Sequence, residues 1–287
     1  MSVKVDAFFD EATNSVSYLV SDPSSGDAMI IDPVLDFDAQ SACTRSYSAD
    51  KILAAVNAAS LTVRYCAETH IHADHLSAGH YLKSKLGCQL LASARLPDIQ
   101  DTFEKIYNVT VHHQPFDRLL EDAETLPLGT LRVTSIATPG HTPACMTLRV
   151  GDCAFVGDTL FMPDYGTARC DFPGGDAKVL YQSIHRIFDL PEATRVFTAH
   201  DYLAPGRSQY AWESSVGEQK RTNIHIGGGR SEQDFITLRT SRDRSLAIPK
   251  LMLPAVQVNI RAGQIPPAEG NGVQYLKIPV NTSLAHP

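Results

Sequence analysis

The chain has 287 residues, of which 43% are hydrophobic and 20% are charged, and its formal net charge is -7. This size is ample for a folded domain with its own core, and the acidic balance argues against a nucleic-acid surface, which needs clustered Lys and Arg. No apolar run approaches the roughly 20 residues of a membrane span, and the N-terminus lacks the basic-then-apolar order of a signal peptide. We therefore expect a cytoplasmic protein with neither a nucleic-acid nor a membrane partner.

In chain order, the first half predicts a hairpin of residues 15–21 and 28–32 and then a helix over 50–61. A strand over 63–69, a second helix over 75–86 and a short strand over 89–93 follow. The turn-rich residues 22–27 separate the two hairpin strands. Asp50 is a possible N-cap of the first helix, and Gly87 suits the C-terminal end of the second.

The second half predicts three strands, over residues 131–138, 146–150 and 153–156. A helix over 176–190 and a final strand over 195–199 follow. Gly151 and Asp152 suit a tight hairpin turn. Strands thus come in two blocks, each accompanied by helices, which favours an α/β fold of four layers, an αββα sandwich. After Tyr202 the chain becomes polar and rich in Gly and Pro. We expect one domain over residues 1–287, with a core of about 1–205 and an extension, 206–287, packed on it.

The six cysteines form no C-x-x-C pair and are irregularly spaced; they are Cys43, Cys66, Cys88, Cys145, Cys153 and Cys170. A disulfide framework is not expected in so long a chain with so few cysteines. The simplest interpretation is a set of reduced, buried thiols.

The strongest chemical signal is His70-x-His72-x-Asp74-His75. Because alternate side chains of an extended segment point to one side, His70 and His72 can face the same way. Asp74 and His75 follow where the next helix is expected to begin. Four groups able to bind a metal within six positions predict a metal site.

Three further candidate ligands follow predicted strands, namely His141 in Pro-Gly-His-Thr, Asp158 in Gly-Asp-Thr and His200 in Ala-His-Asp. A rigid sheet can hold such side chains while loops leave room for a substrate. Each motif alone is weak, but together and in this order they predict one shared site.

The order of these four motifs resembles that of metallo-β-lactamase-fold enzymes over roughly residues 10–205. Two members of that superfamily are the most similar, glyoxalase II and persulfide dioxygenase. Three segments resemble the dioxygenase in sequence: Ile31–Val34 (IDPV), Glu68–His75 (ETHIHADH) and Ala168–Phe172 (ARCDF). Arg169 and Asp171-Phe172 match its usual Gly-Arg-Thr-Asp-Phe string, whereas Ala168 and Cys170 depart from it. The resemblance therefore favours the dioxygenase, in a bacterial subgroup.

By this resemblance one Fe(II) per chain is held by His70, His141 and Asp158, a pair of imidazoles and a carboxylate that suit non-haem iron. The enzyme would oxidise glutathione persulfide with O2 to sulfite and glutathione. The remaining groups, His72, Asp74, His75 and His200, would assist catalysis by hydrogen bonding to the ligands and to water. The alternative is a glyoxalase II-like thioester hydrolase, in which those groups hold a second Zn or Fe ion.

Candidate substrate contacts are Arg169, Tyr202, Lys220, Arg221 and Asn223. The Arg169 guanidinium could grip a glutathione carboxylate or pair with an acidic side chain of the protein. The Tyr202 hydroxyl could donate to the substrate, or the ring could simply be packed. The other three are possible glycine-carboxylate contacts or part of a solvated helix face. The family also leads us to expect a homodimer.

Overall fold

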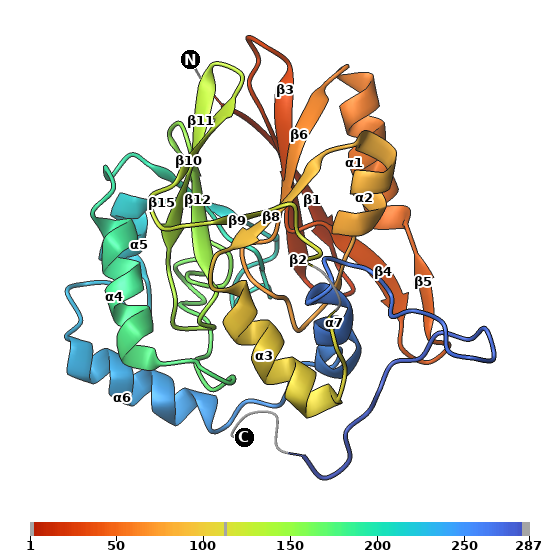
Figure 1. The fold of residues 1–287 in the computed structure, drawn as a ribbon. Coiled ribbons are helices and arrows are strands. Elements are labelled where there is room, and N and C mark those ends of the chain that lie inside the picture. Colours follow the sequence, from red (N-terminus) through yellow and green to blue (C-terminus); the bar gives the residue numbers. More distant parts are fainter. Residues whose placement is uncertain (1–2, 112–113, 283–287) are drawn as a thin grey trace.

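Two six-stranded sheets stand face to face in the computed structural model, which describes residues 3–111 and 114–282 (Figure 1). The first sheet has the order β1 (Lys4–Asp10), β2 (Ser15–Ser21), β3 (Asp27–Ile31), β6 (Thr62–Ala67), β8 (Gln89–Ser93) and β9 (Arg118–Leu120). The second has the order β10 (Thr125–Leu128), β11 (Leu131–Ala137), β12 (Met146–Val150), β13 (Cys153–Phe155), β14 (Arg195–Phe197) and β15 (Glu213–Ser215). A small third sheet consists of β5 (Cys43–Arg45), β4 (Val34–Asp38) and β7 (Leu76–Ser77).

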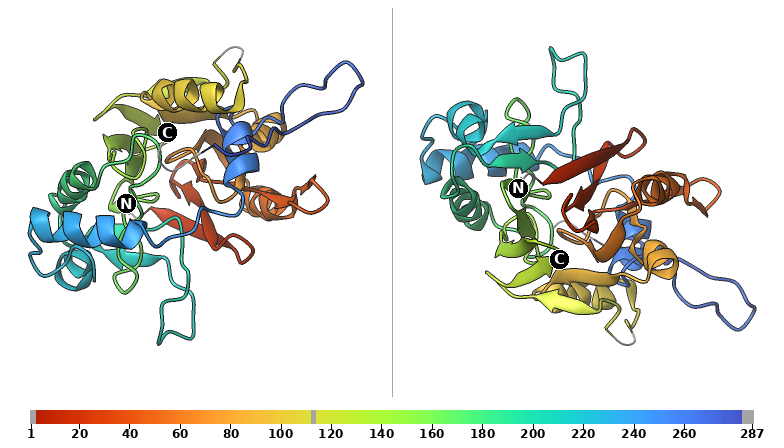
Figure 2. Two further views of the ribbon diagram at one scale, coloured as in Figure 1. Left: turned by 90° about the horizontal axis from the view of Figure 1, so that it is seen from below. Right: turned by 90° about the horizontal axis from the view of Figure 1, so that it is seen from above.

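Helices cover the outer faces of both large sheets. The first sheet packs against α1 (Tyr47–Ala58), α2 (Gly79–Leu86), α3 (Leu96–Tyr107) and α7 (Met252–Asn259), and the second against α4 (Ala177–Phe188), α5 (Val216–Thr222) and α6 (Glu232–Asp243). Figure 2 shows these layers from below and from above. The predicted four-layer αββα sandwich is confirmed.

Alternation along β2 shows how the layers are encoded. Val16, Tyr18 and Val20 lie between the two sheets, in a core that also contains Phe155 of the second sheet. Leu19 points the other way, into the core formed with the outer helices. Because successive side chains of a strand face opposite sides, a strand between two layers is buried at every position, as β2 is.

Two predicted helix starts are wrong. The second helix begins at Gly79 and not at His75, because Leu76 and Ser77 pair with β4 as strand β7. The first helix begins at Tyr47, so Asp50 is not its N-cap but lies in its first turn and accepts a hydrogen bond from the Ser46 hydroxyl. Gly87 does end the second helix in the left-handed conformation, at φ 68°.

Helix α3 was missed by the sequence analysis. Its buried residues Ile99, Phe103 and Tyr107 recur every four positions, and a proline stands in its first turn. This spacing and the proline are ordinary signals of an amphipathic helix.

The C-terminal residues 206–282 pack on the same framework. Strand β15 is the edge strand of the second sheet, α6 lies along α4, and α7 packs against β7 and α3. No helix in the described part of the chain is long and apolar enough to cross a membrane. All six cysteines are free, and five are buried as expected, whereas Cys43 is exposed.

Candidate metal centre

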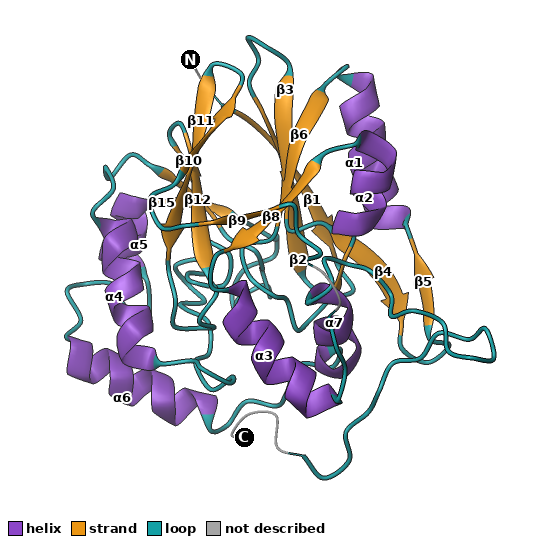
Figure 3. Ribbon diagram, viewed as in Figure 1, coloured by secondary structure: helices purple, strands orange, loops and turns teal. Residues whose placement is uncertain are grey.

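The predicted ligands reach one place because they follow neighbouring strand ends. His70 follows β6, His141 follows β11, Asp158 follows β13 and His200 follows β14. Figure 3 shows the loops concerned, in teal, gathered beneath the two sheets. At the turn before Asp158 only glycine fits, since Gly157 has φ +51° and a Cβ there would lie 2.5 Å from the Thr69 hydroxyl.

His70, His141 and Asp158 form a compact buried group. The Asp158 Oδ2 atom lies 3.9 Å from His70 Nε2 and 3.7 Å from His141 Nε2. One ligand atom from each residue lies within 4.8 Å of the other two, so a single ion between them could contact all three. The two imidazole planes are nearly perpendicular, at 85°.

Hydrogen bonds fix the orientation of both imidazoles. His141 donates its Nδ1 hydrogen to the Arg169 carbonyl at 2.8 Å, which leaves the Nε2 lone pair directed at Asp158. His70 Nδ1 lies 3.1 Å from the Thr69 hydroxyl, which in turn donates to Asp32 at 2.7 Å. Partners of this kind are typical of metal-ligating histidines, because they set the tautomer and the ring plane.

The other four predicted groups lie beside this triad. Asp74 Oδ2 is 3.0 Å from His75 Nδ1 and 3.5 Å from His200 Nε2. His200 Nε2 is also 3.3 Å from Asp158 Oδ1, while His72 Nδ1 is 4.0 Å from Asp74. Ligand atoms of His72, Asp74 and His75 form a second group within 4.8 Å of one another. All seven predicted groups therefore converge.

Unpartnered buried atoms show that these residues fit a metal ion. His72 Nδ1, His75 Nε2, His200 Nε2 and Asp158 Oδ1 are buried and make no hydrogen bond within the described residues. Buried polar groups are normally paired, since leaving one unpaired costs about 1–3 kcal/mol. Several such atoms around one point are explained by a cation that binds their lone pairs.

The protonation states also suit metal binding. Burial and neighbouring imidazoles hold the pKa values of His70 and His72 well below the usual range, so both rings are neutral. Burial opposes ionisation of Asp74, but His200 and His75 outweigh it and lower its pKa, keeping the carboxylate charged. Metal ligands must be deprotonated in this way.

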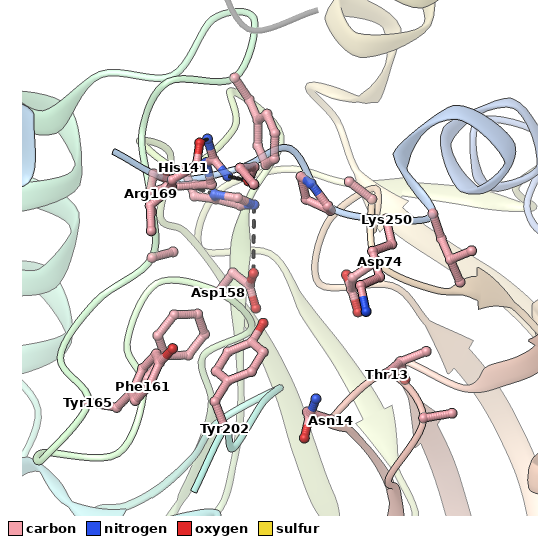
Figure 4. A pocket seen from close by; sticks show the side chains of 18 of the residues that line it. Thr13, Asn14, Asp74, His141, Asp158, Phe161, Tyr165, Arg169, Tyr202 and Lys250 are labelled. Atoms are coloured by element: carbon pink, nitrogen blue, oxygen red, sulfur yellow. Dashed lines mark hydrogen bonds and ion pairs between the residues drawn. The ribbon is translucent and has the colours of Figure 1, made fainter. Parts of the chain in front are cut away.

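A cavity of about 880 Å³ opens above the centre (Figure 4). Asp74, His141 and Asp158 line it, and Figure 4 shows Phe161 and Tyr165 on one side. The remaining polar and aromatic residues labelled around the opening are Thr13, Asn14, Arg169, Tyr202 and Lys250. A substrate in this cavity would reach the metal ligands directly.

Two predicted substrate residues line the cavity. The Tyr202 ring stacks on His200, with centroids 5.5 Å apart, and burial together with Asp158 and Asp74 raises its pKa, so its hydroxyl keeps its proton. The Arg169 guanidinium donates to both Asp171 oxygens, at 2.6 and 2.7 Å, and to the Ala247 carbonyl. Its charge is thus already balanced within the protein.

The other three predicted substrate residues do not line the cavity. Arg221 pairs with Glu192 at the surface, 3.6 Å apart, and Lys220 lies on the same short helix. The Asn223 amide is buried and bonds Gly166 and Gln219. The helix-face interpretation fits Lys220 and Arg221, and Asn223 has a structural role.

Sequence reasoning missed the residues that surround the ligands. Asp32 and Thr69 brace His70, and the Asn14 carbonyl accepts from His200 Nδ1 at 3.1 Å. In addition, Arg242 and Lys250 of the C-terminal extension line the cavity. Asp32 and Thr69 stand in the quoted IDPV and ETHIHADH segments, but no role was assigned to them, and Asn14, Arg242 and Lys250 stand at no recognisable spacing from the motifs.

The model of the metallo-beta-lactamase superfamily matches residues 10–200. The chain belongs to this superfamily. It is 51% identical to a probable metallo-hydrolase of Burkholderia pseudomallei, over 96% of this chain and 99% of that protein. It is 45–48% identical to beta-lactamase hydrolase-like proteins of Agrobacterium fabrum and Xylella fastidiosa, which are longer, so that the chain spans 64–65% of their length.

Two relatives have more specific names, and the names are those of different enzymes. The chain is 41% identical to glyoxylase B2 of Dictyostelium discoideum, over 97% of both proteins. It is 31% identical to the human mitochondrial persulfide dioxygenase ETHE1, over 89% of this chain and 87% of that one. The crystal structure of ETHE1 from Myxococcus xanthus superposes with a TM-score of 0.74 at 29% identity, over 91% of this chain and all of that one. The chain thus belongs to an enzyme superfamily and has a metal-binding site.

Proposed function

We propose that this chain is an Fe(II)-dependent persulfide dioxygenase with one iron per chain. In the overall reaction glutathione persulfide, O2 and water give glutathione, sulfite and two protons. The observation that carries the proposal is the buried group of two imidazoles and one carboxylate, His70, His141 and Asp158, of which His141 and Asp158 line the cavity. These three residues would hold the iron, which would supply redox chemistry toward O2.

The residues around the triad would orient the substrate and hold protons. Tyr202, whose hydroxyl stays protonated and in Figure 4 points toward Asp158, can donate a hydrogen bond to the substrate sulfur. Asp74 and His200 lie within 3.5 Å of each other and can hold a water or proton beside the ligands. His72 and His75 lie beside Asp74 in the same group of polar side chains.

Arg242 and Lys250 are better placed than Lys220, Arg221 and Asn223 to receive the carboxylates of glutathione. Both line the cavity, and within the described residues neither forms an ion pair or a side-chain hydrogen bond. Arg169, in contrast, is already neutralised by Asp171. A cation without an acidic partner is free to pair with an anionic substrate.

A metal analysis combined with an oxygen electrode tests the proposal. We expect the anaerobically iron-loaded protein to hold about one iron per chain, to consume O2 with glutathione persulfide and to release sulfite. Asp158→Asn should lose this activity, whereas His185→Ala, a change on the exposed face of α4, should keep it. If the iron-loaded protein consumes no O2 with this substrate, the proposal is wrong.

The second candidate is a binuclear thioester hydrolase, which the unpartnered atoms His72 Nδ1, His75 Nε2 and His200 Nε2 favour. These atoms, with Asp74, could hold a second ion as two-metal hydrolysis requires. Two metals per chain and O2-independent cleavage of S-lactoylglutathione would support this function over the first. For either activity we propose a cytoplasmic location and a homodimer, with no nucleic-acid or membrane partner.

A further inference from the structure

We propose that Asn259 of α7 is a positioning residue of the metal centre, so that the C-terminal extension shapes the site. Its amide nitrogen donates to the carbonyls of His72 and His75, at 2.8 Å each. Its amide oxygen accepts the Ser77 backbone N–H at 2.8 Å. One side chain therefore holds the backbone on both sides of Asp74, across more than 180 positions of sequence.

A second route joins Asn259 to the imidazole of His72. Ser77, which Asn259 holds by its backbone, donates its hydroxyl to Glu68 Oε1. The other Glu68 oxygen lies 3.6 Å from His72 Nε2, and Asp32 Oδ1 lies 3.1 Å from the same nitrogen. The Nε2 side of the His72 ring thus faces these carboxylates, and the Nδ1 side faces Asp74 at 4.0 Å.

The segment that follows α7 packs closely against the start of α2 and the end of the ligand loop, as we call residues 72–77. The His80 backbone N–H donates to the Ala262 carbonyl at 3.0 Å. Gly263 follows with φ +86°, and a Cβ there would lie 2.4 Å from the Ser77 carbonyl oxygen, so the close approach requires glycine. Asn259 itself is only 2% exposed.

Burial makes the three hydrogen bonds of Asn259 consequential. Residues 72–77 form an irregular segment in which β7 is only two residues long. Without the amide, two buried carbonyls and one N–H would lose partners, and the loop could relax by moving His72 and His75. Since hydrogen bonds around ligands typically change metal affinity 10–100-fold, we expect a loss in that range.

Gln257 provides a matched control on the same helix. It is equally buried, and its amide likewise donates to two carbonyls, those of Leu253 and Lys277, and accepts one N–H, that of Lys277. None of these partners belongs to the ligand loop. Gln257→Ala therefore removes the same number of hydrogen bonds without touching the centre.

The experiment uses the metal-free full-length chain and Co(II) as the probe. We measure the Co(II) dissociation constant in competition with a chelator, the Co(II) absorption spectrum and the urea unfolding of the metal-free protein. Asn259→Ala should weaken Co(II) binding about 10–100-fold and alter the spectrum. Gln257→Ala should keep the dissociation constant within about threefold and keep the spectrum, despite a comparable loss of stability.

Asn259→Leu is the second variant if the alanine variant does not fold. Leucine has nearly the size and branching of asparagine and leaves no cavity, but it removes the donor to the two carbonyls and the acceptor for Ser77, so we again expect weaker Co(II) binding. Wild-type affinity and spectrum in the folded Asn259 variant, or equal losses in the Gln257 variant, would overturn the inference. The inference needs only a metal centre, and a failure of persulfide oxidation with intact Co(II) binding would reject the proposed function alone.

Discussion

Arg239 is the most deeply buried charged side chain that supports the cavity, and its replacement should be costly. It is 1% exposed and pairs with Asp243, one turn further along α6, with atoms 2.6 and 2.9 Å apart. It also donates to the Thr167 carbonyl at 2.8 Å, while Asp243 accepts from the Cys170 backbone N–H at 2.9 Å. The pair thus fixes both ends of the loop that contains Arg169.

The expected cost of Arg239→Ala follows from what remains behind. Asp243 would stay buried with one hydrogen bond, and the Thr167 carbonyl would lose its partner. Removing one member of a buried ion pair typically costs about 3–5 kcal/mol. Arg242→Ala, an exposed change on the same helix, should cost at most about 0.5 kcal/mol.

Urea unfolding of the metal-free proteins measures both values, with unchanged m-values as evidence that the denatured states are comparable. The double change Arg239→Met with Asp243→Leu should restore only part of the loss, because the Thr167 carbonyl and the Cys170 N–H would remain unpaired. A cost below about 1 kcal/mol for Arg239→Ala would refute this account of the loop.

Three other measurements follow from particular contacts. Burial and Arg239 lower the pKa of His225 to about 3, so the unfolded chain takes up a proton below about pH 6.5 that the folded state does not, and stability falls as the pH falls. Between pH 7 and pH 5, urea titration should show the metal-free wild type losing about 1–2 kcal/mol more than His225→Gln. Gly157→Ala should lower the free energy of unfolding by about 2 kcal/mol or more, because the new Cβ would strike the Thr69 hydroxyl. Gly87→Ala, whose Cβ would meet nothing within 4 Å, should lower it by about 1 kcal/mol. Urea unfolding compares the two variants. Removing bound metal with a chelator should lower the thermal midpoint, since a ligand at 1,000 times its Kd contributes about 4 kcal/mol, and an unchanged midpoint would contradict a structural contribution of the ion.

The ligand set could be predicted from the sequence because each ligand follows an apolar run. A strand end fixes where a side chain lies, and four such ends at one edge of the sheets bring His70, His141, Asp158 and His200 together. The start of α2 could not be predicted in the same way. Residues 75–78 have no helix-breaking residue, and it is the pairing of β7 with β4, which is far earlier in the chain, that keeps them extended.

The supporting residues carry no periodic signal. Asn259 and Arg239 act through side-chain hydrogen bonds to backbone groups 72 or more positions away. Such contacts depend on how α6 and α7 dock, which short-range patterns do not encode. The sequence therefore predicted residues 206–287 as an extension with three candidate substrate contacts, but not that α7 contacts the segment of His72 and His75 or that α6 contacts residues 167–170.

The Arg169-x-Asp171-Phe172 string, which resembles the dioxygenase sequence, has a structural role beside His141. Arg169 binds Asp171 two positions on and lies over the Phe172 ring, 5.1 Å from its centroid, so most of the string's charged and aromatic contacts are internal to it. The Arg169 carbonyl, not the guanidinium, contacts a predicted metal ligand, by accepting the His141 hydrogen. A protein that shares this string is therefore expected to share the orientation of that histidine, and any substrate preference must come from other residues of the cavity. Arg242 and Lys250, which line the cavity, are therefore the positions at which glutathione-specific relatives and relatives with uncharged substrates should differ.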